Sequence, residues 1–319
     1  MSYAAAETNI TVVHPYYATA VENVITAVIT SVTSCVFLYI NGVLLFTLRS
    51  KPIFCETSRY ILLFNLLFAD TVQMALSQLL YLLSVLRILL TYPLCGFLVM
   101  LASLTNNISP LTLLVMSLER YVAVCYPLRH STIINVCSTA GAIAVIWALS
   151  SLNVFVRISL LLQFPFEDLK SLEMTQTCSV FVLYLMPVVI QYDKAYTSFL
   201  FVSAFVTIAS SYIGVTLTAR SASTDKASSL KVRNTLLLHL VQLGLNLLST
   251  IHNIMLIAIY NFFDIVVFQH VQTTFYVSII LLPKCLSSLI YGLRDQTIRL
   301  LFMYHICCKN IAAPQPQGF

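Results

Sequence analysis

Seven long apolar runs alternate with short polar segments along the chain. Each run is long enough to cross a bilayer as a helix, which takes about 20 largely apolar residues. Short alternating strands are absent from the pattern, so helices are predicted rather than a membrane barrel. The runs cover approximately residues 24–48, 59–83, 94–126, 139–162, 196–220, 235–262 and 271–293. We therefore expect an all-α membrane protein built as a seven-transmembrane helix bundle.

Three other segments do not match a membrane span. Residues 1–23 are polar enough to form an extracellular tail, and the transmembrane domain is expected over 24–294. The apolar segment 180–190 is too short to span and is interrupted by Pro187, so it is predicted to lie in an outer loop as a lid. Residues 295–302 place apolar and basic positions at helical spacing, which predicts a short amphipathic eighth helix on the inner leaflet. A cytoplasmic tail completes the last region, 295–319.

Composition supports a membrane protein. Of the 319 residues, 59% are hydrophobic and only 9% are charged, and the mean hydropathy is +0.89. A soluble domain of this length would need roughly 25% charged residues. The formal net charge of +5 is modest, and no nucleic-acid partner is expected.

The basic residues are distributed unevenly between the two sides of the predicted bundle. Of the 17 lysines and arginines, three lie on one side, namely Arg87, Lys170 and Lys194, and two lie within spans. Because cytoplasmic loops carry an excess of basic residues, the other side is predicted to be cytoplasmic and the amino terminus extracellular. The twelve residues on that side are Arg49, Lys51, Arg59, Arg120, Arg129, Arg220, Lys226, Lys231, Arg233, Arg294, Arg299 and Lys309.

The cysteines fit this orientation. Of nine, only Cys95 and Cys178 face the predicted exterior, where an oxidising environment lets disulfides persist. We therefore expect a disulfide between them, joining the top of the third helix to the second outer loop. Cys95 lies 25 residues before Arg120, about 37 Å along a helix, which is enough to cross a bilayer.

The third run ends in the motif ERYVAVCYPLRHS, residues 119–131. An isolated acid–base pair such as Glu119 and Arg120 would be an interfacial ion pair that anchors the helix end. Followed by Tyr121, Pro127 and Arg129, however, the pair resembles the cytoplasmic end of the third helix in rhodopsin-like seven-helix receptors. The extended motif resembles the signature of odorant receptors. RYILLF at 59–64 and YGLRDQT at 291–297 are also similar to teleost odorant receptors, particularly the 131-2-like group.

The resemblance implies a signalling role for this end of the bundle. In such receptors the arginine pairs with its acidic neighbour at rest, and its release accompanies an outward swing of the sixth helix that admits a Gα subunit. Carried onto this chain, Arg120 is the switch and Glu119 its latch. Tyr212 and Tyr291 match tyrosines that hold the released arginine. His239 matches a histidine that tunes the switch, although a lone helix-end histidine is otherwise simply interfacial.

Two further charges lie deep within predicted spans, where they are costly unless paired. Asp70 resembles the family's buried aspartate, which often holds a sodium ion, and Asn41 and Ser109 match two of the polar partner positions. We hypothesise that the ammonium group of Lys284 sits beside Asp70 and replaces the sodium ion, because paired charges largely cancel the several kcal/mol that each would cost alone. The alternative is that Lys284 extends to the cytoplasmic surface, roughly 10 Å away.

Arg157 lies toward the outer half of the fourth predicted span. One interpretation is that it faces lipid and reaches the headgroups with its long side chain. The other is that it points into the bundle and pairs with an acidic ligand.

The ligand pocket is expected between the outer halves of helices three, five, six and seven. Counted back from Arg120, the position where amine receptors keep an aspartate is Ala102, so a conventional salt bridge to an amine is not expected. For each candidate contact the alternative is a helix–helix hydrogen bond. The candidate polar contacts are Ser103, Asn106, Asn107, Tyr196, Thr250 and Tyr276.

Modification sites are predicted at both ends of the chain. Asn9 begins a glycosylation sequon in the predicted outer tail. Asn107 begins another, but it lies inside an apolar run, where the glycosylation machinery has no access. Cys307 and Cys308 follow the predicted eighth helix and are palmitoylation candidates, with free thiols as the alternative.

These features together predict an odorant receptor in the plasma membrane, with olfactory cilia as its location if the resemblance holds. Its expected partners are a small-molecule odorant, the lipid bilayer and a heterotrimeric G protein, of Gs/olfactory type by resemblance. The alternatives are a related receptor used outside the nose, or a transporter or channel, against which the odd number of spans argues. No catalytic, metal or cofactor motif is present in the sequence, so neither an enzyme nor a cofactor is expected.

Overall fold

The computed structural model describes residues 3–163, 174, 177–178, 187–222, 241, 244–245, 247–249, 251–260, 262, 265–294 and 296–307. Within these residues, six helical stretches are long and apolar enough to cross a membrane. Five belong to α1 (Tyr3–Ser50), α3 (Ser58–Val85), α4 (Tyr92–Cys125), α6 (Val136–Leu161) and α7 (Pro187–Ala222). The sixth stretch runs from α10 (Ile265–Phe275) through the π-helix η4 (Tyr276–Leu281) into α11 (Leu282–Arg294). The predicted run 235–262 is described only in part and includes α9 (His252–Tyr260).

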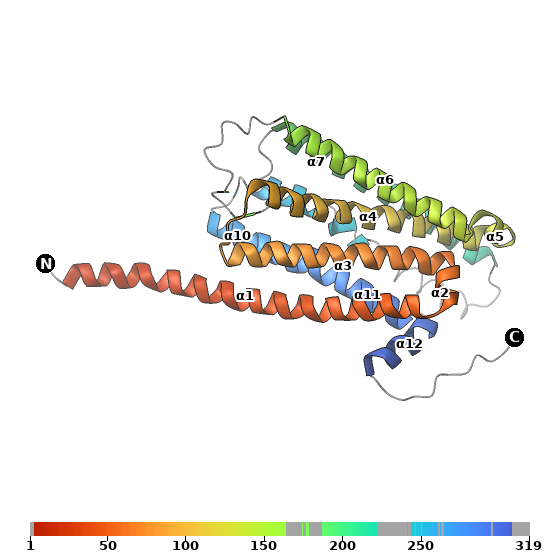
Figure 1. The fold of residues 1–319 in the computed structure, drawn as a ribbon, viewed down its shortest axis with the longest axis horizontal. Helices are drawn as coiled ribbons and strands as arrows, with labels where there is room; N and C mark the ends of the chain where they lie inside the picture. The colour runs from red at the N-terminus through yellow and green to blue at the C-terminus, as the bar shows by residue number, and fades with distance from the viewer. Residues whose placement is uncertain are drawn as a thin grey trace.

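The long helices lie side by side, with α4 at the centre (Figure 1). It packs against α3, α6 and α7, and α3 packs in turn against α1. Four short helices lie at the end of the bundle where α4 finishes: α2 (Pro52–Glu56), η1 (Pro127–Arg129), α5 (His130–Ile133) and α12 (Gln296–Cys307). This end carries the Glu119–Arg120 pair and is the predicted cytoplasmic side.

Apolar packing joins the helices near that end. Leu44 and Leu48 of α1 belong to the same buried cluster as Leu66 of α3, and the cluster also includes Ile298 and Phe302 of α12 and residues of α4 and α7. The outer faces are also strongly apolar, with Phe199 on α7 73% exposed. Large exposed apolar surfaces on a long-helix bundle are those that contact lipid chains in a multi-pass membrane protein. How α12 lies against a lipid surface stays a prediction.

Two helix starts differ from the sequence-based expectation. The fifth span was predicted to begin at residue 196, but α7 begins at Pro187, so residues 187–190 are helical and do not belong to a loop lid. Proline suits the first turn of a helix because no amide donor is needed there, so Pro187 marks the start of α7 and not an interruption. The rest of the predicted lid, 180–186, lies outside the described residues. At the other end, α1 begins at Tyr3 and extends beyond the bundle (Figure 1).

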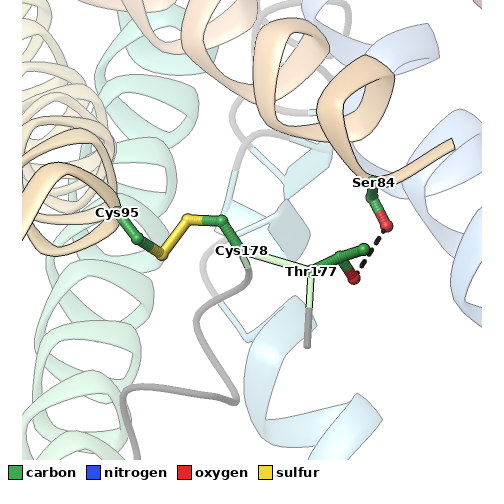
Figure 2. The surroundings of a disulfide bond; sticks show 4 residues. All are labelled: Ser84, Cys95, Thr177 and Cys178. Atoms are coloured by element: carbon green, nitrogen blue, oxygen red, sulfur yellow. Dashed lines mark hydrogen bonds between the residues drawn. A yellow bond between two sulfur atoms is a disulfide. The ribbon is translucent and has the colours of Figure 1, made fainter. Parts of the chain in front are cut away.

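The predicted disulfide is confirmed. Cys95, near the start of α4, is bonded to Cys178, with their Cα atoms 5.6 Å apart (Figure 2). Next to it, Ser84 Oγ at the end of α3 donates a hydrogen bond to Thr177 Oγ1 over 3.3 Å. The backbone amide of Met174 also bonds the Leu90 carbonyl. These three contacts hold Met174, Thr177 and Cys178 against the end of α3, the start of α4 and the residues between them.

Candidate functional site

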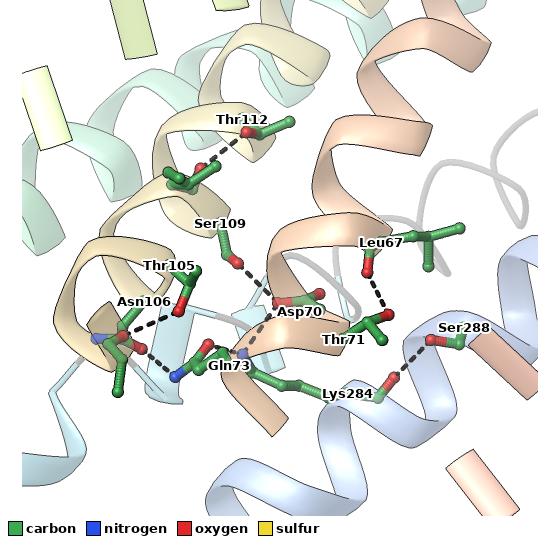
Figure 3. A network of polar contacts seen from close by, with 12 residues as sticks. Leu67, Asp70, Thr71, Gln73, Thr105, Asn106, Ser109, Thr112, Lys284 and Ser288 are labelled. Carbon is green, nitrogen blue, oxygen red and sulfur yellow. Dashed lines mark hydrogen bonds and ion pairs between the residues drawn. The ribbon is translucent and has the colours of Figure 1, made fainter. Parts of the chain in front are cut away.

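A buried polar network joins α3, α4 and α11 in the middle of the bundle (Figure 3). Lys284 Nζ lies 3.0 Å from Asp70 Oδ1 and also donates to Gln73 Oε1. Ser109 Oγ donates to the same Asp70 oxygen over 2.7 Å, and Gln73 Nε2 donates to Asn106 Oδ1 over 2.6 Å. Asp70 and Gln73 are three residues apart on α3, as Asn106 and Ser109 are on α4, so each pair shares one helix face.

The backbone before Lys284 is not regular α-helix. The π-helical turn Tyr276–Leu281 immediately precedes α11, and Pro283 cannot donate the backbone hydrogen bond that an α-helix would require. A π turn holds more residues than an α turn, so it rotates the helix face that follows, and such turns are frequent at functional sites. Here the residue after the proline points into the bundle, where Lys284 is 2% exposed.

The predicted contact between Asp70 and Lys284 is therefore present in the structure. The Lys284 side chain is buried and does not extend to the cytoplasmic surface. Both residues are 2% exposed, so the two charges compensate each other in a region of low dielectric. Asn41 is different. It is fully buried on α1, but neither of its side-chain polar atoms has a hydrogen-bond partner within the described part of the chain. The structure does not bring it into the network.

At the predicted cytoplasmic end, Glu119 lies between two basic side chains. Its Oε2 is 3.4 Å from Arg120 Nε, and its Oε1 is 3.7 Å from Nε2 of His130, the first residue of α5. The glutamate side chain is 10% exposed, whereas that of Arg120 is 25% exposed. The acid is thus held inside the bundle end, and the arginine lies closer to the surface.

The next residue, Tyr121, packs against α7. A Cβ atom added to Gly214 would lie 2.6 Å from Tyr121 Cε2, so the ring occupies the space that the glycine leaves. Tyr212, two residues earlier on α7, is half-buried. His239 lies outside the described residues, and only the backbone of Tyr291 is described, within α11. Their roles beside Arg120 stay predictions.

Arg157 is paired inside the bundle, and the lipid-facing interpretation is wrong. It is 8% exposed, and its guanidinium group forms an ion pair with Asp193 of α7. Arg157 Nη1 also lies 3.5 Å from Ser103 Oγ of α4. Asp193 precedes the predicted start of the fifth span at residue 196 but lies within α7, so the sequence alone does not identify it as the partner of the arginine.

The candidate ligand contacts divide into two groups. Asn107 donates to Asn153 Oδ1 over 3.0 Å, and the Tyr276 hydroxyl donates to Gln78 Oε1 over 3.1 Å, so both already make the helix–helix bonds that were the alternative. Ser103, Asn106 and Tyr196 are only partly buried, although Asn106 accepts from Gln73 and Ser103 from Arg157. Thr250 lies outside the described residues.

The three amide residues Gln73, Gln78 and Asn153 were not among the predicted site residues. Gln78 joins three helices, since it also accepts from Ser34 Oγ on α1 over 3.0 Å. Asn153 donates to the Tyr192 hydroxyl over 3.0 Å. A usable signal was present for Gln73, which lies three residues after Asp70 and therefore on the same helix face.

Comparisons with known proteins agree with this geometry. A protein-family profile described as 7 transmembrane receptor (rhodopsin family) matches residues 40–310. The chain is also similar to "Odorant receptor 131-2" of Danio rerio, with 31% identity over 275 residues. That match covers 86% of this chain and 83% of the relative.

Proposed function

Because the chain belongs to the rhodopsin family of seven-transmembrane receptors, we propose that it is an odorant receptor that activates a heterotrimeric G protein. Its ligand is a small odorant that enters from the extracellular side. The similarity to a zebrafish odorant receptor over most of both chains supports this assignment, and the family's members are signalling receptors rather than enzymes. The G protein is of the Gs/olfactory type, an assignment that rests on the resemblance of the ERYVAVCYPLRHS motif.

The Glu119–Arg120 contact is the observation that carries the proposal. A carboxylate held in the bundle end restrains a neighbouring guanidinium group that is closer to the surface. Release of that arginine changes the charge presented at the cytoplasmic end of α4, and a ligand that favours the released state shifts the population toward it. His130 adds a second basic contact to the glutamate, so the latch also involves α5.

At mid-membrane, Lys284 takes the place that a bound cation would otherwise fill beside Asp70. The ammonium is covalently attached to α11 and is hydrogen-bonded to two residues of α3. The resting state of the receptor therefore carries its own counter-charge for Asp70 and does not depend on an ion from solution.

The test is a cyclic AMP assay in cells that express the full-length chain and receive a panel of water-soluble odorants. Wild type responds to at least one odorant, and Arg120→Ala loses the response at equal surface expression. Lys51→Ala, an exposed basic residue at the same end, is the matched control and keeps it. An odorant-gated current that needs no G protein would contradict the proposal.

A further inference from the structure

Lys284 determines which atoms donate and which accept in the series of hydrogen bonds that runs from Lys284 through Gln73 to Asn106. An ammonium group donates hydrogen bonds and accepts none. Gln73 must therefore turn its carbonyl oxygen toward Lys284, which leaves its amide nitrogen facing α4. There the nitrogen donates to Asn106 Oδ1 over 2.6 Å. The positions of oxygen and nitrogen in a side-chain amide are usually ambiguous. Here the lysine fixes them for both Gln73 and Asn106.

The last amide in this chain presents a donor. Because Asn106 uses its oxygen to accept from Gln73, its amide nitrogen, Nδ2, is the group left to bind something else. Among the described residues no hydrogen bond from that nitrogen is recorded, and the residue is only partly buried. Successive hydrogen bonds polarise one another, so a donor at the end of a chain that begins at an ammonium group is strengthened.

The location of Asn106 suits contact with a ligand. It lies one helical turn from Ser103 on the same face of α4, toward the end of the helix that carries the disulfide. Ser103 is in turn 3.5 Å from Arg157 Nη1. Asn106 thus lies between the mid-membrane network and the polar cluster in the outer half of the bundle.

Among the residues that the structure describes, the two basic groups that border this region are already paired. Lys284 is paired with Asp70, and Arg157 is paired with Asp193. A ligand that carried a net charge would bring it into a buried region without a counter-charge, which is costly. An uncharged ligand avoids that cost.

We propose that Asn106 Nδ2 donates a hydrogen bond to an acceptor oxygen of an uncharged ligand, such as a ketone, an aldehyde or an ester. Gln73 is a positioning residue, which fixes the orientation of the Asn106 amide without contacting the ligand. The inference rests on the proposed function, because it names the ligand class of that same receptor. It predicts selectivity against carboxylates, which are charged, and against compounds that can only donate.

The test measures binding without a G protein. The full-length chain is purified into lipid nanodiscs, and the shift of its thermal unfolding midpoint is titrated with three matched series: 2-alkanones, alkanoates, and pyrroles that carry an alkyl chain on carbon. The 2-alkanones are expected to half-saturate at concentrations about tenfold lower than the other two series, the effect of roughly one hydrogen bond.

Two variants and one control identify the residues responsible. Asn106→Leu removes the preference for ketones over pyrroles. Gln73→Met leaves Asn106 in place but removes the donor to its oxygen, so the Asn106 amide can flip. The preference for ketones over pyrroles then narrows several-fold. A purely structural role for Gln73 would not alter that ratio. Gln78→Met changes the same residue type on the same helix, whose partners are Ser31, Ser34 and Tyr276, and it leaves the preference unchanged.

The inference is overturned if no 2-alkanone shifts the unfolding midpoint, if alkanoates bind better, or if the preference for ketones over pyrroles is unchanged in Asn106→Leu or in Gln73→Met. Failure of the proposed function gives a different result, in which 2-alkanones bind but raise no cyclic AMP. A cyclic AMP response restricted to alkanoates would retain the receptor and reject the ligand class.

Discussion

Lys284 and Asp70 form an ion pair inside the bundle, with Nζ 3.0 Å from Oδ1 and both residues 2% exposed. Removing one member of such a pair leaves an uncompensated charge, which costs about 3–5 kcal/mol. Asp70→Asn and Lys284→Met should therefore each lower cell-surface expression strongly. The double variant, which buries no charge, should exceed both single variants. A double variant no better than the worse single one would show that the two charges do not compensate each other. Lys194→Met, at an exposed position of α7, is the control and should match wild type.

A second prediction concerns sodium. Since the Lys284 ammonium already occupies the cation position beside Asp70, replacing sodium chloride by choline chloride should leave odorant potency of the wild type unchanged. Lys284→Met leaves the Asp70 carboxylate with Ser109 as its remaining hydrogen-bond partner from the network, and its potency should become sodium-dependent. The measurement is a dose–response curve for cyclic AMP in each salt. A sodium-dependent wild type would refute the role of the lysine as a built-in cation.

The ion pair between Arg157 and Asp193 should stabilise the contact between α6 and α7. Asp193→Asn leaves the Arg157 charge buried without its partner, so the unfolding temperature of the purified protein should fall. Arg157→Met combined with Asp193→Leu removes both charges, and it should recover much of the loss. If the double variant is less stable than Asp193→Asn, the pair contributes more than charge compensation and the expectation fails. The matched control is Arg87→Met, a change at an exposed arginine.

The packing of Tyr121 on Gly214 can be tested with one methyl group. Gly214→Ala would place a Cβ atom 2.6 Å from Tyr121 Cε2, which forces the ring or α7 to move and should cost about 1–3 kcal/mol. Combining it with Tyr121→Ala should relieve the clash. Gly141→Ala on α6 is the control, because nothing lies within 4 Å of its added Cβ atom and alanine favours a helix. Thermal unfolding of the purified variants gives the comparison, and equal stability for the two glycine variants would exclude the clash.

Part of the buried network could be predicted from the sequence. A lysine and an aspartate in separate apolar runs each need a partner in a membrane, so their pairing follows from the cost of a lone charge. The orientation of Lys284 depends on the π turn and proline before it, a backbone feature that apolar periodicity does not reveal. Gln73 and Asn106 were harder to connect, because uncharged amides in membrane helices have many possible partners.

The Arg157 pair shows how an error in a helix boundary propagates. Because Pro187 is interpreted as an interruption, the predicted fifth span begins nine residues after the start of α7 and leaves Asp193 outside it. An acid on the first turns of α7 would have offered a partner for the intramembrane arginine. In contrast, the disulfide could be predicted by counting cysteines on each side of the membrane. The predicted topology places only Cys95 and Cys178 on the extracellular side, and these two are bonded.

The most direct test of the account is nucleotide exchange on a purified Gs/olfactory-type heterotrimer mixed with the full-length chain in nanodiscs. Odorants from the water-soluble panel should accelerate exchange with the wild-type chain. With Arg120→Ala the rate should fall to the unstimulated level, while the same odorants still shift the unfolding midpoint of the variant. Exchange that no odorant accelerates, or that Arg120→Ala supports as well as wild type, would contradict the claim that Arg120 couples ligand binding to the G protein.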